Sequence, residues 1–411
     1  MNEAFTLSVG IDCGSQVHQV CVLNTSQTLV GERRVEHAGA DIQALSDWLL
    51  TLGETDPSRI VVAIEVPRGP IVEALLERGL RVWAINPKQL DRFRERGSAA
   101  GAKDDRRDAW ALASAVQTDR YAFRALVVDE PQIIQLRGLS RLDAELGEEL
   151  TRTTNRLRDH LHRYYPQLLR LCPAADEPWV WRLLALAPTP AQGQQLRRAA
   201  LQRLVKQARI RRFTADDLLA ILRTPSLTVA PGTVEAASHY VTVLLPRLHL
   251  LHSQRLECSK QLACLLETLT EEPGQDREHH DVTILLSLPG VGTRIAATML
   301  AEASQPLGAR DYHAVRSLAG LAPVTKASGT RRVVVMRYAC NTRLRTACYH
   351  WARVATQTDV AARRHYTILR QAGHAHPRAL RGVADRLLAV LIGMLKSNTL
   401  YDHQRRRTAV A

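Results

Sequence analysis

The chain has 411 residues and a mass of 45.8 kDa. This length allows two or three domains with their own cores and excludes small proteins that depend on disulfides or a structural metal. The 55 Lys and Arg residues outnumber the 41 Asp and Glu residues, which gives a formal net charge of +14. Seven cysteines are scattered without a CxxC pair, so we expect reduced thiols and neither a disulfide framework nor a zinc site.

The basic residues are almost all arginine, and this composition favours a polyanionic partner. A guanidinium group can bind phosphate through two hydrogen bonds, and a basic surface strengthens nucleic-acid binding by counterion release. A general bias towards arginine codons is the alternative explanation. No run of eighteen apolar residues and no basic leader with a cleavage site occurs, so we expect a cytoplasmic protein without a membrane partner.

Residues 1–125 predict an α/β domain. The β-branched runs LSVGI, VHQVCVL, RIVVAIEV and LRVWAIN alternate with helical segments at about 40–52, 69–78 and 104–118.

Residues 126–280 predict a long helical coiled-coil spacer. From Pro131, leucines in three-and-four spacing indicate a helix that stops near Cys172 and Pro173, and a second long helix is expected from about Val234 to Leu269. The two helices could pair antiparallel. Residues 174–230 between them predict several short inserted helices, broken by Pro188, Pro190 and Pro225. The periodic leucines are Leu139, Leu142, Leu146, Leu150, Leu157, Leu161 and Leu168.

Residues 281–411 predict a mostly α-helical C-terminal domain. It opens with LLSLPGVGTRIAATMLAEA, stays mostly helical to Leu400 and ends in a basic tail at Arg405–Arg407.

Acidic residues in the first domain form the strongest chemical pattern. Asp12 and Glu65 end two predicted strands, where an α/β sheet presents its site. Asp105 and Asp108 lie three residues apart at the start of a predicted helix and therefore on one face of its first turn. Four converging carboxylates would bind Mg²⁺ or Mn²⁺, which can promote phosphodiester cleavage.

Each acid also has a structural explanation. Asp12 could cap a turn, Glu65 could pair with Arg68, and the acids of DDRRD could lie on a solvated helix face. Asp104 is either an outer acid or an N-cap. A phosphate loop of the actin and sugar-kinase type at Asp12-Cys13-Gly14 would need a second Asp-x-Gly, and the chain has none.

The C-terminal domain offers two further candidates. LPGVG at 288–292 is typical of a helix-hairpin-helix turn, in which Gly290 and Gly292 would let backbone N–H groups approach a DNA phosphate, although a plain helix C-cap has the same glycines. Ser328 precedes Gly329, with Lys326, Arg331 and Arg332 nearby, so it could attack phosphorus with cationic assistance. An ordinary Ser-Gly turn is the alternative.

The order of these motifs resembles the DEDD transposases, the insertion sequence 110 family of recombinases. In that family a RuvC-like domain of the RNase H type precedes a transposase domain that bears a serine. GID, IEV and KDDRRDA carry the resemblance over about 5–118, and LPGVG, GLAP and SG carry it over 282–355. KDDRRDA is similar to Lys-Thr-Asp-x-x-Asp-Ala, which assigns Asp105 and Asp108 to the acidic tetrad with Asp12 and Glu65. The SG pair assigns the role of proposed nucleophile to Ser328.

Two departures from the family pattern are present. RYACNTRLR at 337–345 has Cys340 where glycine is usual, although Asn341, Leu344 and Arg345 fit. The inserted helices at 174–230 lengthen the spacer, and no role for them carries over from the family.

The resemblance implies a metal-dependent DNA transposase that cuts and rejoins strands through a phosphoserine link. It also implies a structured guide RNA and nucleoid association during action. The coiled-coil spacer suggests a homo-oligomer, a dimer or tetramer, and the resemblance adds that the serine completes a metal site on another protomer. Within this interpretation Gly290, Gly292, Lys326, Arg331 and Arg332 contact nucleic acid. A RuvC-like structure-selective nuclease using water, and a non-enzymatic nucleic-acid scaffold, remain the alternatives.

Overall fold

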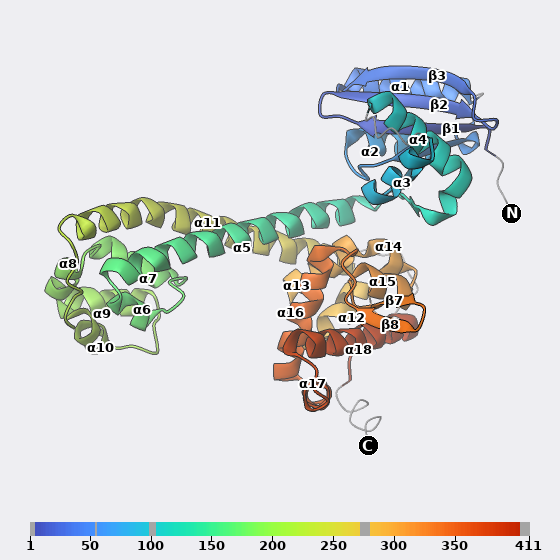
Figure 1. Ribbon diagram of the computed structural model, residues 1–411. Coiled ribbons are helices and arrows are strands. Elements are labelled where there is room, and N and C mark those ends of the chain that lie inside the picture. The colour runs from blue at the N-terminus through green and yellow to red at the C-terminus, as the bar shows by residue number, and fades with distance from the viewer. Residues whose placement is uncertain (1–4, 54–55, 98–103, 272–279, 403–411) are drawn as a thin grey trace. The chain divides into compact units, whose positions relative to one another are not determined.

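The computed structural model describes residues 5–53, 56–97, 104–271 and 280–402. Lys103 of the KDDRRDA segment and the predicted basic tail at Arg405–Arg407 lie outside the described residues. Contacts divide the chain into two compact units, residues 1–129 and 130–411 (Figure 1). The predicted boundary near residue 125 lies close to this division, whereas the further boundary near 280 lies inside the second unit and stays a prediction.

The first unit is built on a six-stranded mixed sheet in the order β3-β2-β1-β4-β5-β6. β2 pairs antiparallel with both β1 and β3, β1 and β4 pair parallel, and so do β4 and β5. The central strands are the predicted apolar runs, and β4 is buried throughout. The strands are β1 (Leu7–Cys13), β2 (Val17–Asn24), β3 (Leu29–Glu36), β4 (Ile60–Ile64), β5 (Arg81–Ala84) and β6 (Arg124–Ala125).

Helices cover both faces of this sheet, because alternate strand residues point to opposite sides. One face packs Val9 and Val62 with α1 and α2, and the other packs Val61 and Ala63 with Leu112 of α4. The unit is therefore mixed α/β, as predicted. Its helices are α1 (Gly39–Leu52), α2 (Pro70–Glu77), α3 (Pro87–Gly97) and α4 (Asp105–Asp119), with short 3₁₀ turns at Pro57–Arg59 and Arg120–Ala122.

Helix α4 lies unusually close to β1, and Gly10 makes this possible. A Cβ atom at Gly10 would lie 1.9 Å from the carbonyl oxygen of Ala109 and 2.5 Å from the amide nitrogen of Ala113. The small side chains of Ala109 and Ala113 are buried against Cys21 and Leu23 of β2. The contact fixes the first turn of α4, with its acids, beside the strand that carries Asp12.

In the second unit, two long helices pack antiparallel. These are α5 (Pro131–Tyr164) and α11 (Thr233–Glu271). The thiol of Cys258 donates to the carbonyl of Leu139 at 3.3 Å, whereas His160, near the other end of α5, stacks on Tyr240 with 4.0 Å between ring centroids. The predicted antiparallel pairing is therefore confirmed within the chain.

The predicted end of the first long helix is wrong. α5 stops at Tyr164 because Pro166 has no N–H to continue the helical hydrogen bonds and restricts the residue before it, and the separate α6 then ends before Cys172. Most of the periodic leucines pack inside the chain: Leu146 lies against one core and Leu157 is buried in another. Leu142 is 46% exposed, so it does not belong to this packing.

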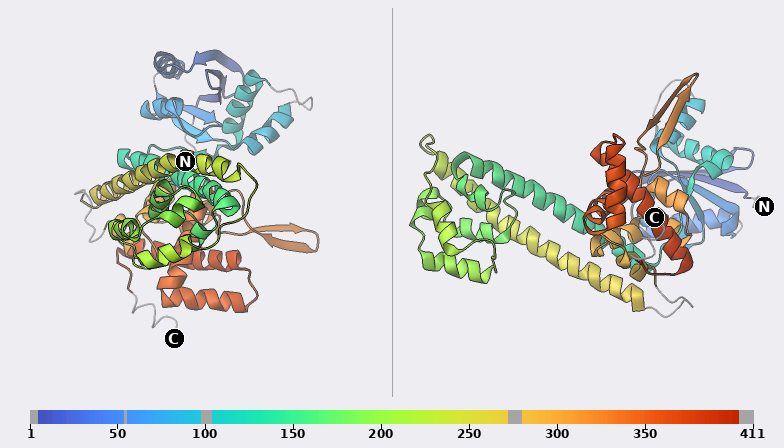
Figure 2. Two further views of the ribbon diagram at one scale, coloured as in Figure 1. Left: turned by 90° about the vertical axis from the view of Figure 1, so that its left-hand side faces the viewer. Right: turned by 90° about the horizontal axis from the view of Figure 1, so that it is seen from below.

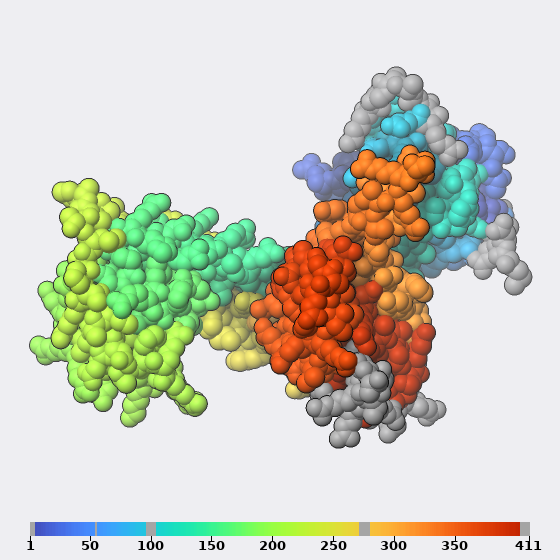
Figure 3. All heavy atoms as spheres, turned by 60° about the horizontal axis from the view of Figure 1, so that its bottom comes forward, coloured from blue at the N-terminus to red at the C-terminus, as the bar shows by residue number. Residues whose placement is uncertain are grey.

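Residues 165–232, which we call the helical subdomain, pack around one end of the helix pair (Figure 3). The predicted short helices are present, and Pro188, Pro190 and Pro225 lie at their boundaries. Their apolar faces meet Leu157 and Leu161 of α5 and Val241 of α11 in a single core that includes the buried rings of Trp179 and Trp181. The helices are α6 (Gln167–Leu171), α7 (Pro178–Leu186), α8 (Pro190–Gln195), α9 (Arg198–Gln207) and α10 (Ala215–Leu222).

The C-terminal part is mostly helical and forms a separate core with the other end of the helix pair. Leu136 of α5 and Leu262 of α11 pack with Trp351 and Leu388. A two-stranded hairpin, β7 (Val324–Ser328) and β8 (Arg331–Val335), stands out from these helices (Figure 2). None of the helices in the described part of the chain is both long and apolar enough to span a membrane. The helices are α12 (Asp281–Ser287), α13 (Thr293–Glu302), α14 (Ser304–Gly308), α15 (Tyr312–Leu318), α16 (Thr342–Thr358), α17 (Val360–Gln371) and α18 (His376–Ser397).

The close approach of α4 to β1 predicts that Gly10→Ala destabilises the first unit. The added methyl group would overlap the α4 backbone, and overpacking of this kind costs about 1–3 kcal/mol, or roughly 3–10 °C in melting temperature. Gly39→Ala is the control, because a Cβ atom there meets nothing within 4 Å. Thermal unfolding followed by circular dichroism tests this, and equal melting temperatures for the two variants would contradict the described contact.

Candidate active site

Asp12 and Glu65 lie side by side at the end of the parallel pair β1 and β4. The register pairs Ile11 with Ile64, so the next residues along both strands are Asp12 and Glu65. Both carboxylates are partly buried. The structure therefore brings together the two acids that the sequence places at strand ends.

The first turn of α4 contributes Asp105 and Asp108. Asp104 is the N-cap, and its side chain accepts a hydrogen bond from the amide of Arg106 at 3.4 Å. Asp105 is exposed, whereas Asp108 is only 2% exposed. Asp104 is thus a capping residue. Asp105 and Asp108 are the acids of α4 that lie near the ends of β1 and β4.

The other three acids lie near enough to Asp12 to affect its pKa. Burial and then the negative charges of Asp108, Asp105 and Glu65 raise the pKa of Asp12 to about 6, against a single opposing effect from Arg94. In the described part of the chain Glu65 makes no ion pair with Arg68, so this alternative explanation for Glu65 does not apply. The four predicted acids therefore form one negatively charged site.

Arg94 of α3 contributes a positive charge to this site, and no motif in the sequence predicts this role. Its Nη2 donates to Oδ2 of Asp108 at 2.7 Å, its Nε lies 2.5 Å from Oδ1 of the same residue, and its Nη1 donates to Asp91 at 2.7 Å. The segment RFRERG offered no signal that distinguishes Arg94 from Arg92. Only the packing of α3 beside α4 selects it.

The donor set fits a hard divalent cation in type and charge. Carboxylate oxygens are the ligands that Mg²⁺ and Mn²⁺ prefer, and four acids with one nearby arginine leave the site with net negative charge. In the described part of the chain, no three of these acids bring ligand atoms within 4.8 Å of one another. Side-chain rotation would therefore accompany ion binding, and Asp108 would exchange Arg94 for the ion.

A more compact potential ligand group lies in the helical subdomain, at Cys172, Asp176 and Glu177. Its atoms are already engaged: Asp176 accepts from the Cys172 thiol at 3.3 Å, and Glu177 accepts from Trp179 at 2.6 Å and from Arg212 at 2.5 Å. Burial also raises the pKa of Cys172, which disfavours a thiolate ligand. We interpret this group as part of the subdomain's structure.

Ser328 is the last residue of β7, at the tip of the hairpin. It pairs with Arg331 across the two-residue turn Gly329-Thr330, and Gly329 has a φ of +55°, which favours glycine. Ser328 is exposed, as are Lys326, Arg331 and Arg332. The Ser-Gly pair therefore does occupy a tight turn, one that presents the serine hydroxyl to solvent.

The faces of the hairpin separate the three cations. Residues directly opposite each other share a face, and successive residues alternate. Because Ser328 pairs with Arg331 and Lys326 pairs with Val333, these four share one face. Arg332 pairs with Ala327 and lies on the other face.

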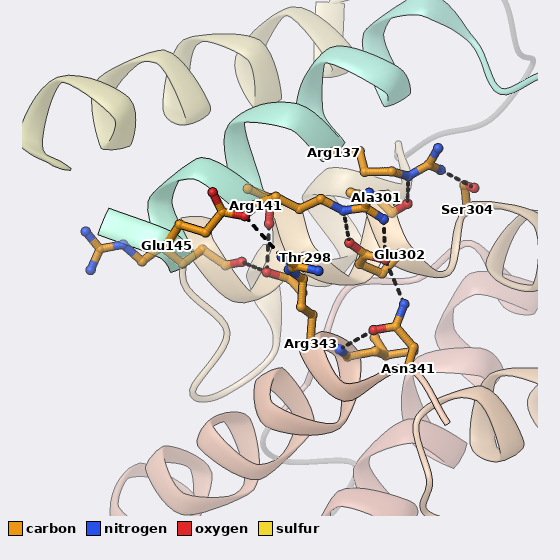
Figure 4. A network of polar contacts seen from close by, with 12 residues as sticks. Arg137, Arg141, Glu145, Thr298, Ala301, Glu302, Ser304, Asn341 and Arg343 are labelled. Carbon is orange, nitrogen blue, oxygen red and sulfur yellow. Dashed lines mark hydrogen bonds and ion pairs between the residues drawn. The ribbon is translucent and has the colours of Figure 1, made fainter. Parts of the chain in front are cut away.

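A polar network anchors the chain just beyond the hairpin (Figure 4). The carboxylate of Glu302, 4% exposed, accepts two hydrogen bonds from Arg141 at 2.8 and 3.1 Å and one from Asn341 at 2.7 Å. Burial alone would raise the pKa of Glu302, but these hydrogen bonds together lower it. Asn341 in turn caps α16 by accepting from the amide of Leu344 at 3.1 Å. The network joins α5, α13 and α16 at the base of the hairpin.

Cys340, beside this network, does not need to be glycine. Its φ is not positive, and its side chain packs against Gly320, where a Cβ atom would lie 2.8 Å from the sulfur. The departure from the family pattern therefore leaves the local turn intact.

The LPGVG turn joins α12 to α13, and its glycines differ. Gly290 has a φ of +82°, and a Cβ atom there would lie 2.7 Å from the amide nitrogen of Ala355, so packing against α16 explains this residue. Gly292 is exposed at the N-cap of α13, with nothing within 4 Å of a Cβ position. Of these two glycines, only Gly292 is exposed.

Comparison with known proteins identifies the family. A transposase model, DEDD_Tnp_IS110, matches residues 9–166, and a model for the transposase IS116/IS110/IS902 family matches residues 282–367. The "Mini-circle putative transposase for IS117" of Streptomyces coelicolor is 32% identical over 413 residues, covering 98% of this chain and 97% of that protein. The chain belongs to the IS110 family of transposases.

Other relatives of this IS110-family chain agree. The "Insertion element IS110 uncharacterized 43.6 kDa protein" of Streptomyces coelicolor is 29% identical over 407 residues, covering 96% of this chain and 95% of that protein. The "Putative transposase y4uE" of Sinorhizobium fredii is 45% identical over 207 residues, which span 50% of this chain and 58% of that relative. Residues 167–281 lie between the two family models, so neither model covers most of the helical subdomain.

The pKa of Asp12 predicts a pH-dependent effect of Asp12→Asn. The folded pKa of about 6 exceeds the ordinary value of 3.8, so the folded state binds more protons in this window and its stability falls as pH rises through it. Asparagine at position 12 carries no charge and therefore removes the loss of stability that accompanies ionisation of Asp12. In EDTA, Asp12→Asn should therefore melt at a higher temperature than the unaltered chain at pH 7.5, and the advantage should shrink towards pH 5.

Asp41→Asn, an exposed aspartate in the first turn of α1, is the control and should show no such gain. A constant difference between Asp12→Asn and the unaltered chain from pH 5 to pH 7.5 would mean that the pKa of Asp12 is not raised in the folded chain.

Proposed function

We propose that this IS110-family transposase cuts and rejoins the DNA of an insertion sequence, with Mg²⁺ or Mn²⁺ at Asp12, Glu65, Asp105 and Asp108 and with Ser328 as the nucleophile. The gathering of these acids around Asp12 is the observation that carries the proposal. The strand order, with antiparallel β1 to β3 followed by parallel β4 and β5, supports an RNase H or RuvC-like assignment for the first unit.

The acids would supply the ion site for phosphoryl transfer. A bound divalent ion supplies stabilisation of negative charge on the phosphoryl oxygens and lowers the pKa of an attacking hydroxyl. Asp12 and Glu65 are held by neighbouring strands, and Asp105 and Asp108 by the first turn of α4, so the backbone positions of the ligands are fixed before DNA binds. Arg94 retains Asp91 as a partner when it releases Asp108.

Ser328 would conserve the energy of the broken bond. Its Oγ attacks phosphorus, a phosphoserine ester forms, and the DNA oxygen leaves as a hydroxyl. Attack by the hydroxyl of a second strand reverses the step and rejoins DNA without hydrolysis. Lys326 and Arg331, on the same hairpin face as Ser328, would neutralise charge on the phosphoryl oxygens.

The remaining parts of the proposal concern partners. The net charge of +14 supports binding of DNA and of a structured guide RNA. We assign Gly292 a contact between its backbone and a DNA phosphate. Gly290, in the same turn, and Arg332, on the same hairpin as Ser328, would lie beside the bound nucleic acid. Exposed Val243 and Leu250, seven residues apart on α11, offer a coiled-coil surface for a homo-oligomer, a dimer or tetramer. The protein would act in the cytoplasm at the nucleoid.

The serine mechanism predicts a covalent protein–DNA adduct. Incubation with cognate DNA, its guide RNA and Mg²⁺ should give an adduct whose modified peptide contains Ser328, detected on denaturing gels and by mass spectrometry. Ser328→Ala should abolish the adduct and recombination while DNA binding persists, because the exposed hydroxyl contributes little packing. Asp12→Asn should also abolish the adduct.

A structure-selective nuclease would give a different result. Ser328→Ala would then cleave normally and release a free 5′-phosphate without an adduct, whereas loss of any of the four acids would stop cleavage. Binding without cleavage under all these conditions would indicate a scaffold instead.

The hairpin register predicts unequal roles for its arginines. Arg331→Ala should slow adduct formation by about 10- to 100-fold, because it removes a cation from the face of Ser328. Arg332→Ala makes the same change in charge on the opposite face, so its rate should remain within about threefold of the rate of the unaltered chain. Single-turnover rates at saturating DNA measure both, and a larger effect at Arg332 would reverse the assignment of the reactive face.

A further inference from the structure

The helical subdomain carries a concentration of positive charge that the catalytic proposal does not use. Its residues 165–232 include ten Lys or Arg and four Asp or Glu, so their formal net charge is +6. Seven of the cations fall within residues 197–212, a stretch without any acid. All seven are exposed: Arg197, Arg198, Arg203, Lys206, Arg209, Arg211 and Arg212.

Packing of α9 (Arg198–Gln207) places the cations of this helix on its outer side. Leu201 and Leu204 are buried in the subdomain core, and three-and-four spacing puts them on one face of the helix. Arg203 and Lys206 lie on the opposite face by the same periodicity. The core therefore forces the charged side chains of this helix towards solvent.

Two of the seven cations form ion pairs with acids. Arg198 forms a two-point ion pair with Asp216 at 2.7 and 2.8 Å. Arg212 contacts Glu177 and lies 5.2 Å from the ring of Phe213. In the described part of the chain the other five make no ion pair. We call these five the basic surface: Arg197, Arg203, Lys206, Arg209 and Arg211.

Arg209 adds a second observation. Its φ is +52°, in the left-handed region, directly after the end of α9. The amide of Ile210 bonds back to the carbonyl of Val205 at 3.0 Å, which is the arrangement that usually places glycine at this position. An arginine at this position costs conformational energy that glycine would avoid.

The chemistry of the surface selects a duplex backbone. Single-stranded nucleic acid is bound mainly by exposed aromatic rings on which bases stack. The rings of Tyr164, Tyr165, Trp179 and Trp181 are buried, and none of the aromatic residues within 165–232 is classed as exposed. Unpaired cations without exposed rings match the regular phosphates of a duplex, which contacts of this kind bind without reading sequence.

We propose that the basic surface of the helical subdomain binds the phosphate backbone of duplex DNA, on elements separate from those that carry the acids and Ser328. Duplex DNA is the occupant because the chain belongs to a transposase family. The inference requires neither the serine mechanism nor the metal site.

The test is the salt dependence of binding by the full chain. A fluorescent 30-base-pair DNA duplex is titrated at several salt concentrations with the unaltered chain and with Arg203→Gln/Lys206→Gln/Arg209→Gln/Arg211→Gln. Each lost phosphate contact should reduce the slope of log K against log salt by about 0.9, so four contacts reduce it by up to about 3.6. Affinity at low salt should fall by on the order of 10- to 100-fold.

The matched control removes four exposed arginines from the C-terminal helices, Arg353→Gln/Arg363→Gln/Arg370→Gln/Arg378→Gln, and should keep the slope. An equal loss in both variants would attribute binding to total charge and overturn the proposal, as would an unchanged slope in the first. A loss confined to duplex RNA of the same length would replace DNA by RNA as the partner and also overturn it.

Two further variants separate charge from folding. Arg203→Lys/Arg209→Lys/Arg211→Lys, which keeps Lys206, should retain most of the affinity. A contact with the phosphate backbone requires a cation more than a particular geometry. If the quadruple variant unfolds, Lys206→Gln alone replaces it in the titration and should lower the slope of log K against log salt by about 0.9. Cleavage by the quadruple variant at saturating DNA should persist, which distinguishes failure of this surface from failure of the catalytic site.

Discussion

The candidate active site depends on the contact between Gly10 of β1 and the backbone of α4. Asp12 lies two residues beyond this glycine, and Asp108 lies beside Ala109, whose carbonyl a Cβ atom at Gly10 would meet. The closeness of strand and helix therefore sets the distance between acids that are almost one hundred residues apart in sequence. Mutual repulsion among the carboxylates opposes this arrangement. The buried apolar contacts of α4 with β4 and with β2 offset the repulsion.

Much of this architecture was predictable because it follows from buried apolar periodicity. The runs that became β1, β2, β4 and β5 are apolar, and the strand ends then located Asp12 and Glu65. The edge strand β3 was missed because its sequence, LVGERRVE, is charged and mostly exposed. The β7–β8 hairpin was missed for a related reason: its strands have almost no buried residues, so no alternation marked them.

Contacts between distant residues could not be predicted in the same way. Arg94 binds Asp108 because α3 packs beside α4, and Arg141 binds Glu302 because α5 crosses α13. Periodicity identifies the face that a residue occupies but does not identify its partner on another element. The acids of the candidate site were found from their positions at element ends, whereas the arginine that binds Asp108 could be found only from the assembled fold.

The helix α5 passes through two separate cores, since Leu136 belongs to the C-terminal core and Leu157 to that of the helical subdomain. Leu146 packs against the first of these cores and Leu150 against the second, so the two cores meet within about 6 Å of rise along one continuous helix. Both cores of the second unit therefore depend on the continuity of α5, and a break in this helix between Leu146 and Leu150 would uncouple the helical subdomain from the C-terminal helices.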